Sequence, residues 1–385
     1  MANALRTALA AVTLAAVSAT AAHAQADSVF AVSSGGASLL RLNTDGSLVV
    51  RGAVGVGSVP ATGLGERMMW FPSRFAFRAG RLVNTLEEGD GTAYWDEASI
   101  GAGSAAFGLN TRASGENSFA AGRTSRASGN NSLSFNGHAT SAGAIALGSG
   151  AQATGDDALA MGPSSIAGGL ASIVMGPSIA NGNFGVAIGL QNSASGQFSV
   201  AIGKNARTAN RQGSVVLGDG CAGFSSDSVY PTANNQFVVR GCGGIKMYTT
   251  QNLSSGVEVT PGGGSWSSIS DRNRKENFLA LEGESVLTRL RSVPVTTWNY
   301  KTQDRGIRHI GPTAQDLYAA FGVGESNLLI NTVDIDGINL AAAKELDART
   351  AAQETRIGAL EAENADLKKR LERLEALLGE RAAQP

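Results

Sequence analysis

A short segment recurs along the middle of the chain and limits what the chain can fold into. Nine such segments lie between residues 104 and 218, and each mixes small and apolar residues before a closing glycine or asparagine. They are SAAFG, SFAAG, SLSFN, AIALG, ALAMG, SIVMG, GVAIG, SVAIG and SVVLG, ending at Gly108, Gly122, Asn136, Gly148, Gly162, Gly176, Gly189, Gly203 and Gly218. Successive spacings are 14, 14, 12, 14, 14, 13, 14 and 15 residues. A sustained period of this size is typical of a solenoid in which each repeat forms one coil.

Each coil is predicted to hold two short strands joined by turns. In SVAIG, Val200 and Ile202 point to one side of the strand, and Ser199 and Ala201 point to the other. Shorter units such as RASGEN and QATGDD lie between these segments, and their glycines allow turns and close backbone approach. One coil cannot bury its apolar row alone. We therefore expect stacked coils to bury it, and several joined chains to bury more.

The repeat resembles the head of trimeric autotransporter adhesins, which is built from SVAIG-type coils. The resemblance covers residues 104–218. It implies a left-handed parallel β-roll and a homotrimer, neither of which follows from the spacing alone. We expect a mainly β protein with this β-roll head at residues 104–220 and a β-rich neck or connector at residues 221–264.

The segment before the repeats, residues 25–103, has the pattern of a β-rich lead-in. SLLRLNTDGSLVVRG alternates around an NTDG turn, which predicts a hairpin. GERMMWFPSRFAFRAG also alternates and is rich in aromatic residues. We interpret Phe71, Phe75 and Phe77 as packing residues at the base or cap of the roll rather than as a ligand site.

Residues 1–24 have the features of a signal peptide. Arg6 gives a positive charge, ALAAVTLAAVSATAA gives the apolar run, and AHA fits a small-x-small cleavage site ending at Ala24. Cleavage after Ala26 is the alternative. No later run is long and apolar enough for a transmembrane helix. We expect an exported protein that is extracellular or on the cell surface, with the periplasm as an alternative.

Charge and histidine content argue against several classes of function. The net charge is −1, so no basic field indicates nucleic acid binding. Only His138 and His309 follow the signal peptide, without a Cys/His cluster, so we expect no metal site and no cofactor. Asp156 and Asp157 are adjacent in TGDDAL. We interpret them as solvent-facing turn residues rather than as glycosidase carboxylates.

The two cysteines, Cys221 and Cys242, both lie in the part of the chain that is predicted to be exported. An oxidising compartment favours a disulfide between them. Two free thiols in a loop region are the alternative.

The C-terminal segment, residues 346–380, has the heptad pattern of a parallel coiled coil. The a positions are Ile357, Asn364, Leu371 and Leu378, the d positions are Leu360, Leu367 and Leu374, the g positions are Arg356, Glu363 and Arg370, and the e positions are Glu361, Lys368 and Glu375. All three g-to-e′ pairs have opposite charges, as a parallel, in-register homo-oligomer requires. Asn364 fixes the register and often favours two strands. We prefer three, because every coil of the β-roll would take part in a trimer.

Four motifs lie between the connector and the heptads. They are SWSSISDRNRKENF, VLTRLRSVPVTTWNYK, RHIGPTAQDLYAAFG and VDIDGINLAAAKEL. Their order resembles the C-terminal intramolecular chaperone of phage tailspikes and tail fibres such as endosialidases. It is also similar to the self-cleaving domain of the membrane-bound myelin regulatory factor. The resemblance implies a small α+β chaperone domain at residues 265–345 that helps a trimer assemble and then cuts itself off.

The resemblance also assigns site residues. The family's Ser-Lys pair maps onto Ser270 and Lys275, and the cut falls between Ile269 and Ser270. The supporting motif positions are Asp271, His309, Gln315 and Asp316, and their roles are open.

The residue types fit this chemistry independently of the resemblance. A serine becomes a nucleophile when a base takes its proton, and lysine can be that base only in its neutral form. Arg272 and Arg274 flank Lys275 and disfavour its charged form. Side chains five residues apart face different sides of a strand or helix, so Ser270 and Lys275 can meet only across a bend or between chains. SDRN supplies turn residues, and Ser270 or Asp271 can cap a short helix.

We therefore interpret the chain as an exported trimeric fibre or adhesin-like protein with a self-removing chaperone domain. Its catalysis would be one intramolecular cut per chain by a Ser-Lys dyad. One alternative is a phage-type fibre that binds a receptor or a polysaccharide, and the head's ligand could be a host surface or a glycan. Another is a protein that keeps its chaperone domain as a stalk.

Overall fold

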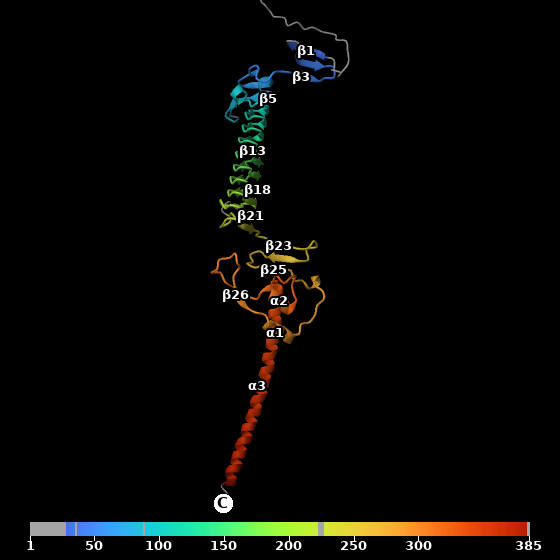
Figure 1. Ribbon diagram of the computed structural model, residues 1–385. Coiled ribbons are helices and arrows are strands. Elements are labelled where there is room, and N and C mark those ends of the chain that lie inside the picture. The colour runs from blue at the N-terminus through green and yellow to red at the C-terminus, as the bar shows by residue number, and fades with distance from the viewer. Residues whose placement is uncertain (1–27, 35–36, 88, 222–226, 383–385) are drawn as a thin grey trace, which may run out of the picture. The chain divides into compact units, whose positions relative to one another are not determined.

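The computed structural model describes residues 28–34, 37–87, 89–221 and 227–382. The chain divides into two compact units between Gly244 and Ile245 (Figure 1). This division falls inside the segment that was predicted to be a connector. The predicted signal peptide lies outside the described residues.

The first unit begins with antiparallel strands. β1 (Ser28–Ser34), β2 (Ala37–Asn43) and β3 (Leu48–Val50) form one sheet, with Leu42 opposite Leu48 across the predicted NTDG turn. β4 (Gly65–Phe71) and β5 (Ala76–Leu82) form a second hairpin, joined by a 3-10 turn (η1, Pro72–Arg74). Two shorter strands, β6 (Asn84–Thr85) and β7 (Gly89–Asp90), and a 3-10 turn (η2, Glu97–Ser99) follow.

The β4–β5 hairpin starts the solenoid, because β5 pairs in parallel with the first repeat strand. Phe71 is buried beside Trp95, and the ring of Phe77 lies 5.4 Å from that of Phe107. Both therefore pack at the end of the roll, as the sequence predicts. Phe75 is 43% exposed and has a left-handed backbone conformation.

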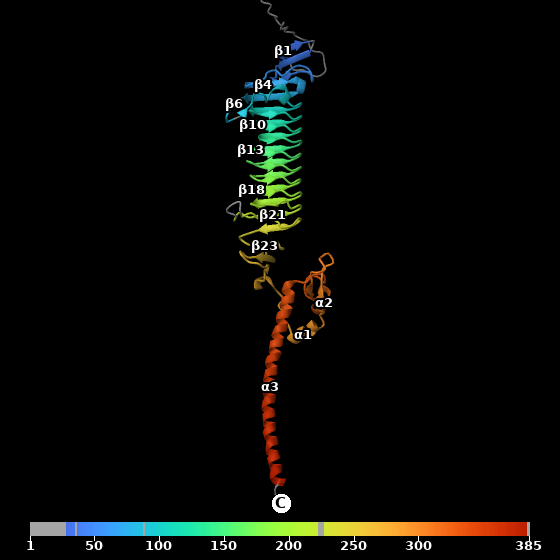
Figure 2. The same cartoon turned by 90° about the vertical axis from the view of Figure 1, so that its left-hand side faces the viewer.

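The repeats form a solenoid of stacked parallel strands (Figure 2). Its strands are β8 (Ala105–Leu109), β9 (Arg112–Ala113), β10 (Phe119–Arg123), β11 (Arg126–Ala127), β12 (Leu133–Ala139), β13 (Ile145–Ala153), β14 (Leu159–Met161), β15 (Ile166–Ala167), β16 (Ile173–Met175), β17 (Ile179–Ala180), β18 (Val186–Leu190), β19 (Ser193–Ala194), β20 (Val200–Lys204), β21 (Val215–Gly218) and β22 (Phe237–Arg240). Equivalent residues pair from coil to coil, as Val186, Ala187 and Ile188 do with Val200, Ala201 and Ile202. The parallel solenoid predicted from the repeat is confirmed.

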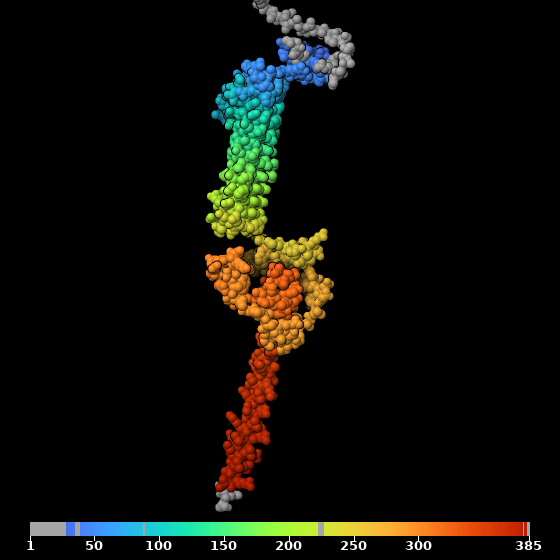
Figure 3. Space-filling model, viewed as in Figure 1, coloured from blue at the N-terminus to red at the C-terminus, as the bar shows by residue number. Residues whose placement is uncertain are grey.

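Small side chains fill the interior of the solenoid. Alanines are fully buried on most strands, with Ser134, Val174 and Val216 at the equivalent inner positions of β12, β16 and β21, and serines at several strand entries are buried with them. Several of these serines donate to a glycine carbonyl three residues earlier, as Ser118 Oγ does to Gly115 O at 2.6 Å and Ser199 Oγ to Gly196 O at 2.6 Å. The hydroxyls of these serines are thereby satisfied. Figure 3 shows the outer surface of these closely stacked coils.

The larger apolar row is exposed, which contradicts the prediction that stacked coils would bury it. It lies on the outer face of the first strand of each coil, where the coil of a single chain cannot cover it. Its members Phe107, Phe119, Phe135, Met161, Met175 and Ile202 are 37–51% exposed. The reason is the alternation of side chains along a strand, which places Ala201 inside the coil and Val200 and Ile202 outside.

The second unit combines a small sheet with three helices. β23 (Ile245–Tyr248), β24 (Gly256–Val259) and β25 (Ser267–Ser268) are antiparallel, and the 3-10 turn η3 (Arg272–Arg274) follows. α1 (Gly283–Arg291), a hairpin of β26 (Thr296–Trp298) and β27 (His309–Gly311), α2 (Ala314–Phe321) and α3 (Thr332–Ala382) complete the unit. A core joins the three helices and consists of Val286, Leu287, Val293, Leu317, Ile338 and Ala342. The predicted small α+β region and C-terminal helix are confirmed.

The helix α3 continues far beyond this core. The heptad residues Ile357, Leu360, Leu367, Leu371, Leu374 and Leu378 are 39–66% exposed. In the described part of the chain, no helix combines the length and the apolar character needed to cross a membrane.

Candidate functional site

The segment before the predicted cut is held as an extended strand. In β25, Ser268 pairs with Val257 and Ser267 with Glu258 of β24. The pairing continues for one residue, because Ile269 N–H donates to Gly256 O at 3.1 Å. The residue on the amino side of the Ile269–Ser270 bond is therefore fixed by the neighbouring strand.

A single turn follows the predicted cut and brings Ser270 and Lys275 together. Asp271 begins the turn by accepting a hydrogen bond from Asn273 N at 2.9 Å, and Lys275 N–H donates to Arg272 O at 3.2 Å. The turn reverses the chain, and Lys275 Nζ lies 2.6 Å from Ser270 Oγ. The bend expected from the sequence is present, with Asp271 as its cap. At this distance a proton can pass between the two side chains.

The carboxylate beside the Ser270–Lys275 pair binds an arginine rather than the lysine. Arg274 Nε lies 3.7 Å from Asp271 Oδ2, and the Arg272 guanidinium lies 4.9 Å from the centre of the Phe278 ring. No ion pair joins Lys275 to a carboxylate among the residues that the structure describes. Asp271 therefore pairs with an arginine, and the lysine amine faces the serine.

Arg274 also connects the turn to the small sheet. Its Nη1 donates to the carbonyl oxygen of Leu253, in the loop between β23 and β24, at 2.6 Å. This contact was not predicted from the sequence, because every residue has a backbone carbonyl and residue types therefore do not identify the acceptor. Two residues of one hairpin thus support the site: Gly256 bonds the strand before the predicted cut, and Leu253 bonds the turn after it.

The pair is open to solvent within one chain. Every residue from Ser270 to Ala280 is exposed. Nothing in the single chain therefore desolvates the Ser270 hydroxyl or the Lys275 amine.

The other predicted motif residues lie on different elements. His309 is on β27, where its Nε2 is 2.8 Å from Gln303 Oε1 and its ring packs against Trp298 at 4.8 Å. Asp316 is in the first turn of α2, where its carboxylate accepts from Thr313 Oγ1 at 2.7 Å and its N–H donates to the same oxygen, so that Thr313 caps the helix. Gln315 precedes it in the same turn. Within the described ranges no hydrogen bond or ion pair links these three residues to Ser270 or Lys275.

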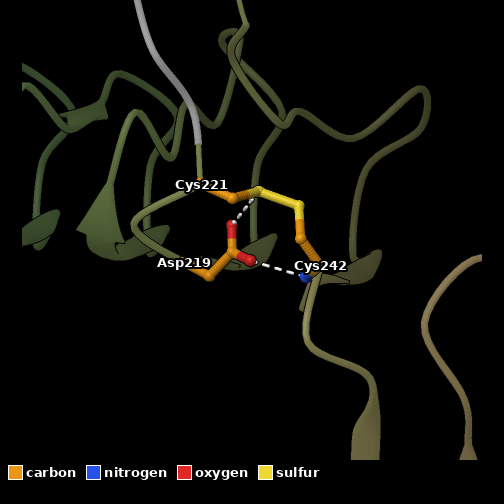
Figure 4. Close-up of side chains that lie close together, drawn as sticks. All are labelled: Asp219, Cys221 and Cys242. Carbon is orange, nitrogen blue, oxygen red and sulfur yellow. Dashed lines mark hydrogen bonds between the residues drawn. A yellow bond between two sulfur atoms is a disulfide. The ribbon is translucent and has the colours of Figure 1, made fainter.

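A second cluster of reactive side chains lies at the end of the solenoid (Figure 4). The structure joins Cys221 and Cys242 in a disulfide with a Cα–Cα distance of 6.3 Å. Asp219 lies beside it: one carboxylate oxygen is 3.0 Å from Cys221 Sγ and the other accepts from Cys242 N–H. The Cys242 N–H and the Arg240 guanidinium, 2.9 Å from Asp219 Oδ1, hold the pKa of Asp219 below its ordinary value.

These three residues are the only group in the described part of the chain whose donor atoms could surround a metal ion. The disulfide removes both thiolates as ligands, which leaves a single carboxylate already bonded to Arg240. The cluster therefore ties β21 to β22 rather than forming a metal centre.

The solenoid and the Ser-Lys turn define a repeat-built fibre head joined to a chaperone-type domain. Family comparisons agree with both parts. Residues 270–323 match the chaperone of endosialidase family, a peptidase family. Residues 99–125, 113–135, 139–165, 153–178 and 180–206 match the YadA head domain repeat. No match was found among curated proteins.

The two family matches confirm the resemblances drawn from the sequence. They support an adhesin-like or tailspike-type protein that carries a self-cleaving type of intramolecular chaperone domain. Heads of the YadA type form trimers, and proteins that carry them are extracellular or surface-exposed.

Proposed function

We propose that the chain is an exported, trimeric, adhesin-like fibre whose C-terminal domain drives assembly and then cleaves the bond between Ile269 and Ser270. Ser270 is the nucleophile and Lys275 is the base. The observation that carries the proposal is the 2.6 Å separation of Lys275 Nζ and Ser270 Oγ beside a strand-held Ile269. The match to a peptidase family over residues 270–323 supports it.

The position of the serine, directly after the bond, indicates the order of steps. Neutral Lys275 takes the Ser270 hydroxyl proton while Oγ attacks the carbonyl carbon of Ile269. The C–N bond then breaks, the proton passes to the released α-amine, and Ile269 is left as an ester on Oγ. Water hydrolyses this ester, which gives a carboxylate at Ile269 and returns the Ser270 hydroxyl. No external substrate or cofactor enters these steps.

The exposure of the pair couples cleavage to assembly. A lysine amine is a base only when neutral, and burial favours the neutral form. Ser270 and Lys275 are exposed in one chain, so we infer that neighbouring chains of the trimer supply the burial. An unassembled chain would then hold the two groups together without cutting.

Two exposed apolar surfaces support the trimer. The outer row of the solenoid includes Phe119 and Phe135, and the heptad seam of α3 includes Leu367 and Leu374; all four side chains are at least 39% exposed. Exposed apolar rows of this length are typical of surfaces that another chain covers. Export depends on residues 1–24, whose pattern is that of a signal peptide.

Three proteins test the dyad on a denaturing gel: wild type, Ser270→Ala and Lys275→Arg. We expect wild type to separate into two fragments without added protease, and both variants to stay full length. Arginine keeps the cation but cannot act as a base near neutral pH. Native mass measurement serves as the control, because Ser270→Ala removes only a hydroxyl and should still form trimers. Equal cutting in Ser270→Ala would exclude Ser270 as the nucleophile, and an uncut wild-type trimer would favour a retained stalk.

A further inference from the structure

The second strands of the first two coils, and the corresponding end of β12 in the third, carry a row of cationic and hydrogen-bonding side chains on their outer face. Arg112 in β9 pairs with Arg126 in β11, and Arg126 pairs with His138 in β12. The alanine that follows each of them is fully buried, so the three side chains project outward. Gln152 continues the row in the next coil. We call Arg112, Arg126 and His138 the cationic row; its members are spaced at roughly 5 Å, the distance between paired strands.

An aromatic residue holds the two arginines in place. The guanidinium carbons of Arg112 and Arg126 lie 6.0 and 5.3 Å from the centre of the Tyr94 ring, and Arg126 Nη2 donates to the Tyr94 hydroxyl. The neighbouring Trp95 is fully buried and donates its indole N–H to Thr111 O at 2.9 Å. Trp95 therefore anchors the loop that presents Tyr94. Arginines that are positioned before a ligand arrives lose less entropy when it binds.

The row has no anionic partner within the chain. Among the described residues, no ion pair joins a carboxylate to Arg112, Arg126 or His138. Like charges placed directly across a sheet destabilise it. Burial, together with the nearby Arg126, lowers the pKa of His138, so near neutral pH this residue acts as an uncharged hydrogen-bond group. An anionic ligand would remove the repulsion between the two arginines.

The row also lies away from the surface that other chains are expected to cover. Phe107 and Phe119 are on the first strands β8 and β10, whereas Arg112 and Arg126 are on the second strands β9 and β11. In the third coil the longer strand β12 carries Phe135 near its start and His138 near its end. In a trimer that buries the first strands, the second strands remain in contact with solvent. This step depends on the proposed trimer, but the contacts of the row do not.

We propose that the cationic row is a binding site for an acidic polysaccharide that runs along the stack of coils. Guanidinium groups bind carboxylates and sulfates through paired, charge-assisted hydrogen bonds. Arg112 and Arg126 would hold acidic groups of the chain, and His138 and Gln152 would bind its hydroxyls.

The test measures binding of the full chain to a heparin oligosaccharide, with hyaluronan as a carboxylate-only probe and dextran as a neutral one. We expect binding to one or both acidic probes at low salt, weaker binding at about 0.5 M salt, and none to dextran. The variant Arg112→Gln with Arg126→Gln should lose at least about tenfold in affinity. Its matched control, Arg207→Gln with Arg211→Gln, removes the same charge at the other end of the solenoid and should stay within about twofold.

Several results would overturn the proposal. They are absence of binding to both acidic probes, equal binding to dextran, and equal loss in the two double variants, which would mean that only net charge matters. Thermal melting shows whether each variant folds. If the Arg112 and Arg126 double variant does not, Arg126→Gln alone replaces it, because Arg126 is exposed, and should lose at least about threefold. Heparin binding that is unchanged in that variant would also contradict the site. The readout is independent of cleavage at Ser270.

Discussion

The solenoid and the long helix α3 solve the problem of burying apolar surface in opposite ways. Each coil of the solenoid buries alanines such as Ala160 and Ala201 completely, and neighbouring coils share their backbone hydrogen bonds. The second half of α3 buries nothing within its own chain: Leu367 and Leu371 are 50% and 56% exposed. The solenoid therefore has an interior of its own, whereas this part of the helix has a surface that requires other chains.

The two regions therefore have different roles in folding and assembly. A helix with an exposed heptad seam gains stability mainly by association, so it can select the number and register of the chains. The parallel coils contact one another across many residues and fold only after distant segments meet, which is slow for parallel strands. A tail that aligns three chains would shorten that search. Once the coils have formed, their own contacts hold them, so the proposed removal of the tail would leave the solenoid intact.

The largest effect is expected from the seam of α3. In a Ser270→Ala background, which keeps the tail attached, changing Leu367, Leu371 and Leu374 to Gln should abolish trimers at micromolar concentration, because the apolar seam is lost. Light scattering coupled to size-exclusion chromatography measures the mass. Leu377→Gln is the control, because Leu377 is 54% exposed but lies outside the a and d positions. A stable trimer in the triple variant would mean that the solenoid alone selects three chains.

A smaller effect is expected from a close backbone contact between coils. A methyl group at Gly182 would lie 2.1 Å from the carbonyl oxygen of Gly196 in the next coil, so the coils must separate. Gly182→Ala should lower the stability of the solenoid by about 1–3 kcal/mol, seen as a lower melting temperature. Gly220→Ala is the matched control, since no atom lies within 4 Å of its added methyl. Equal melting temperatures would show that the stack is looser than the contacts indicate.

A further effect concerns the rate of cutting rather than stability. Arg274→Gln removes the 2.6 Å hydrogen bond to Leu253 O that fixes the turn bearing Ser270 and Lys275. Loss of one charge-assisted hydrogen bond should slow cleavage by about tenfold. Arg272→Gln removes the same charge beside Lys275 but only a contact with Phe278, so a time course of the two variants separates positioning from electrostatics. Similar rates in both would indicate that charge alone matters.

Much of this organisation could be predicted from the sequence because it depends on periodic patterns. The 14-residue spacing gave the parallel coils, and alternation in SVAIG placed Val200 and Ser199 on opposite sides. Turn chemistry in SDRN predicted the bend between Ser270 and Lys275, with Ser270 or Asp271 as the cap, and the structure has Asp271 in that role. Each of these features is local, and each has a signature in residue type and spacing.

Other features had no such signature. Alternation separates Ala201 from Val200 and Ile202, but it does not tell which of the two sides faces the interior, so the burial of alanine instead of the Val and Ile row could not be predicted. The contact from Arg274 to Leu253 joins residues 21 apart through a backbone carbonyl. His309 and Asp316 match the motif, but their contacts in the single chain are with Gln303, Trp298 and Thr313. The position of Tyr94 over two arginines depends on the buried Trp95, which pattern reasoning does not reveal.

The central claim is that the assembled protein cuts itself before Ser270, and the masses of its fragments test this most directly. Purified wild-type protein, incubated without protease, should yield one fragment ending at Ile269 and one beginning with Ser270-Asp271-Arg272. Once trimers have formed, the rate should be the same after tenfold dilution, because the reacting groups belong to one assembly. A fragment with a different first residue, or a trimer that stays at full length, would contradict the account.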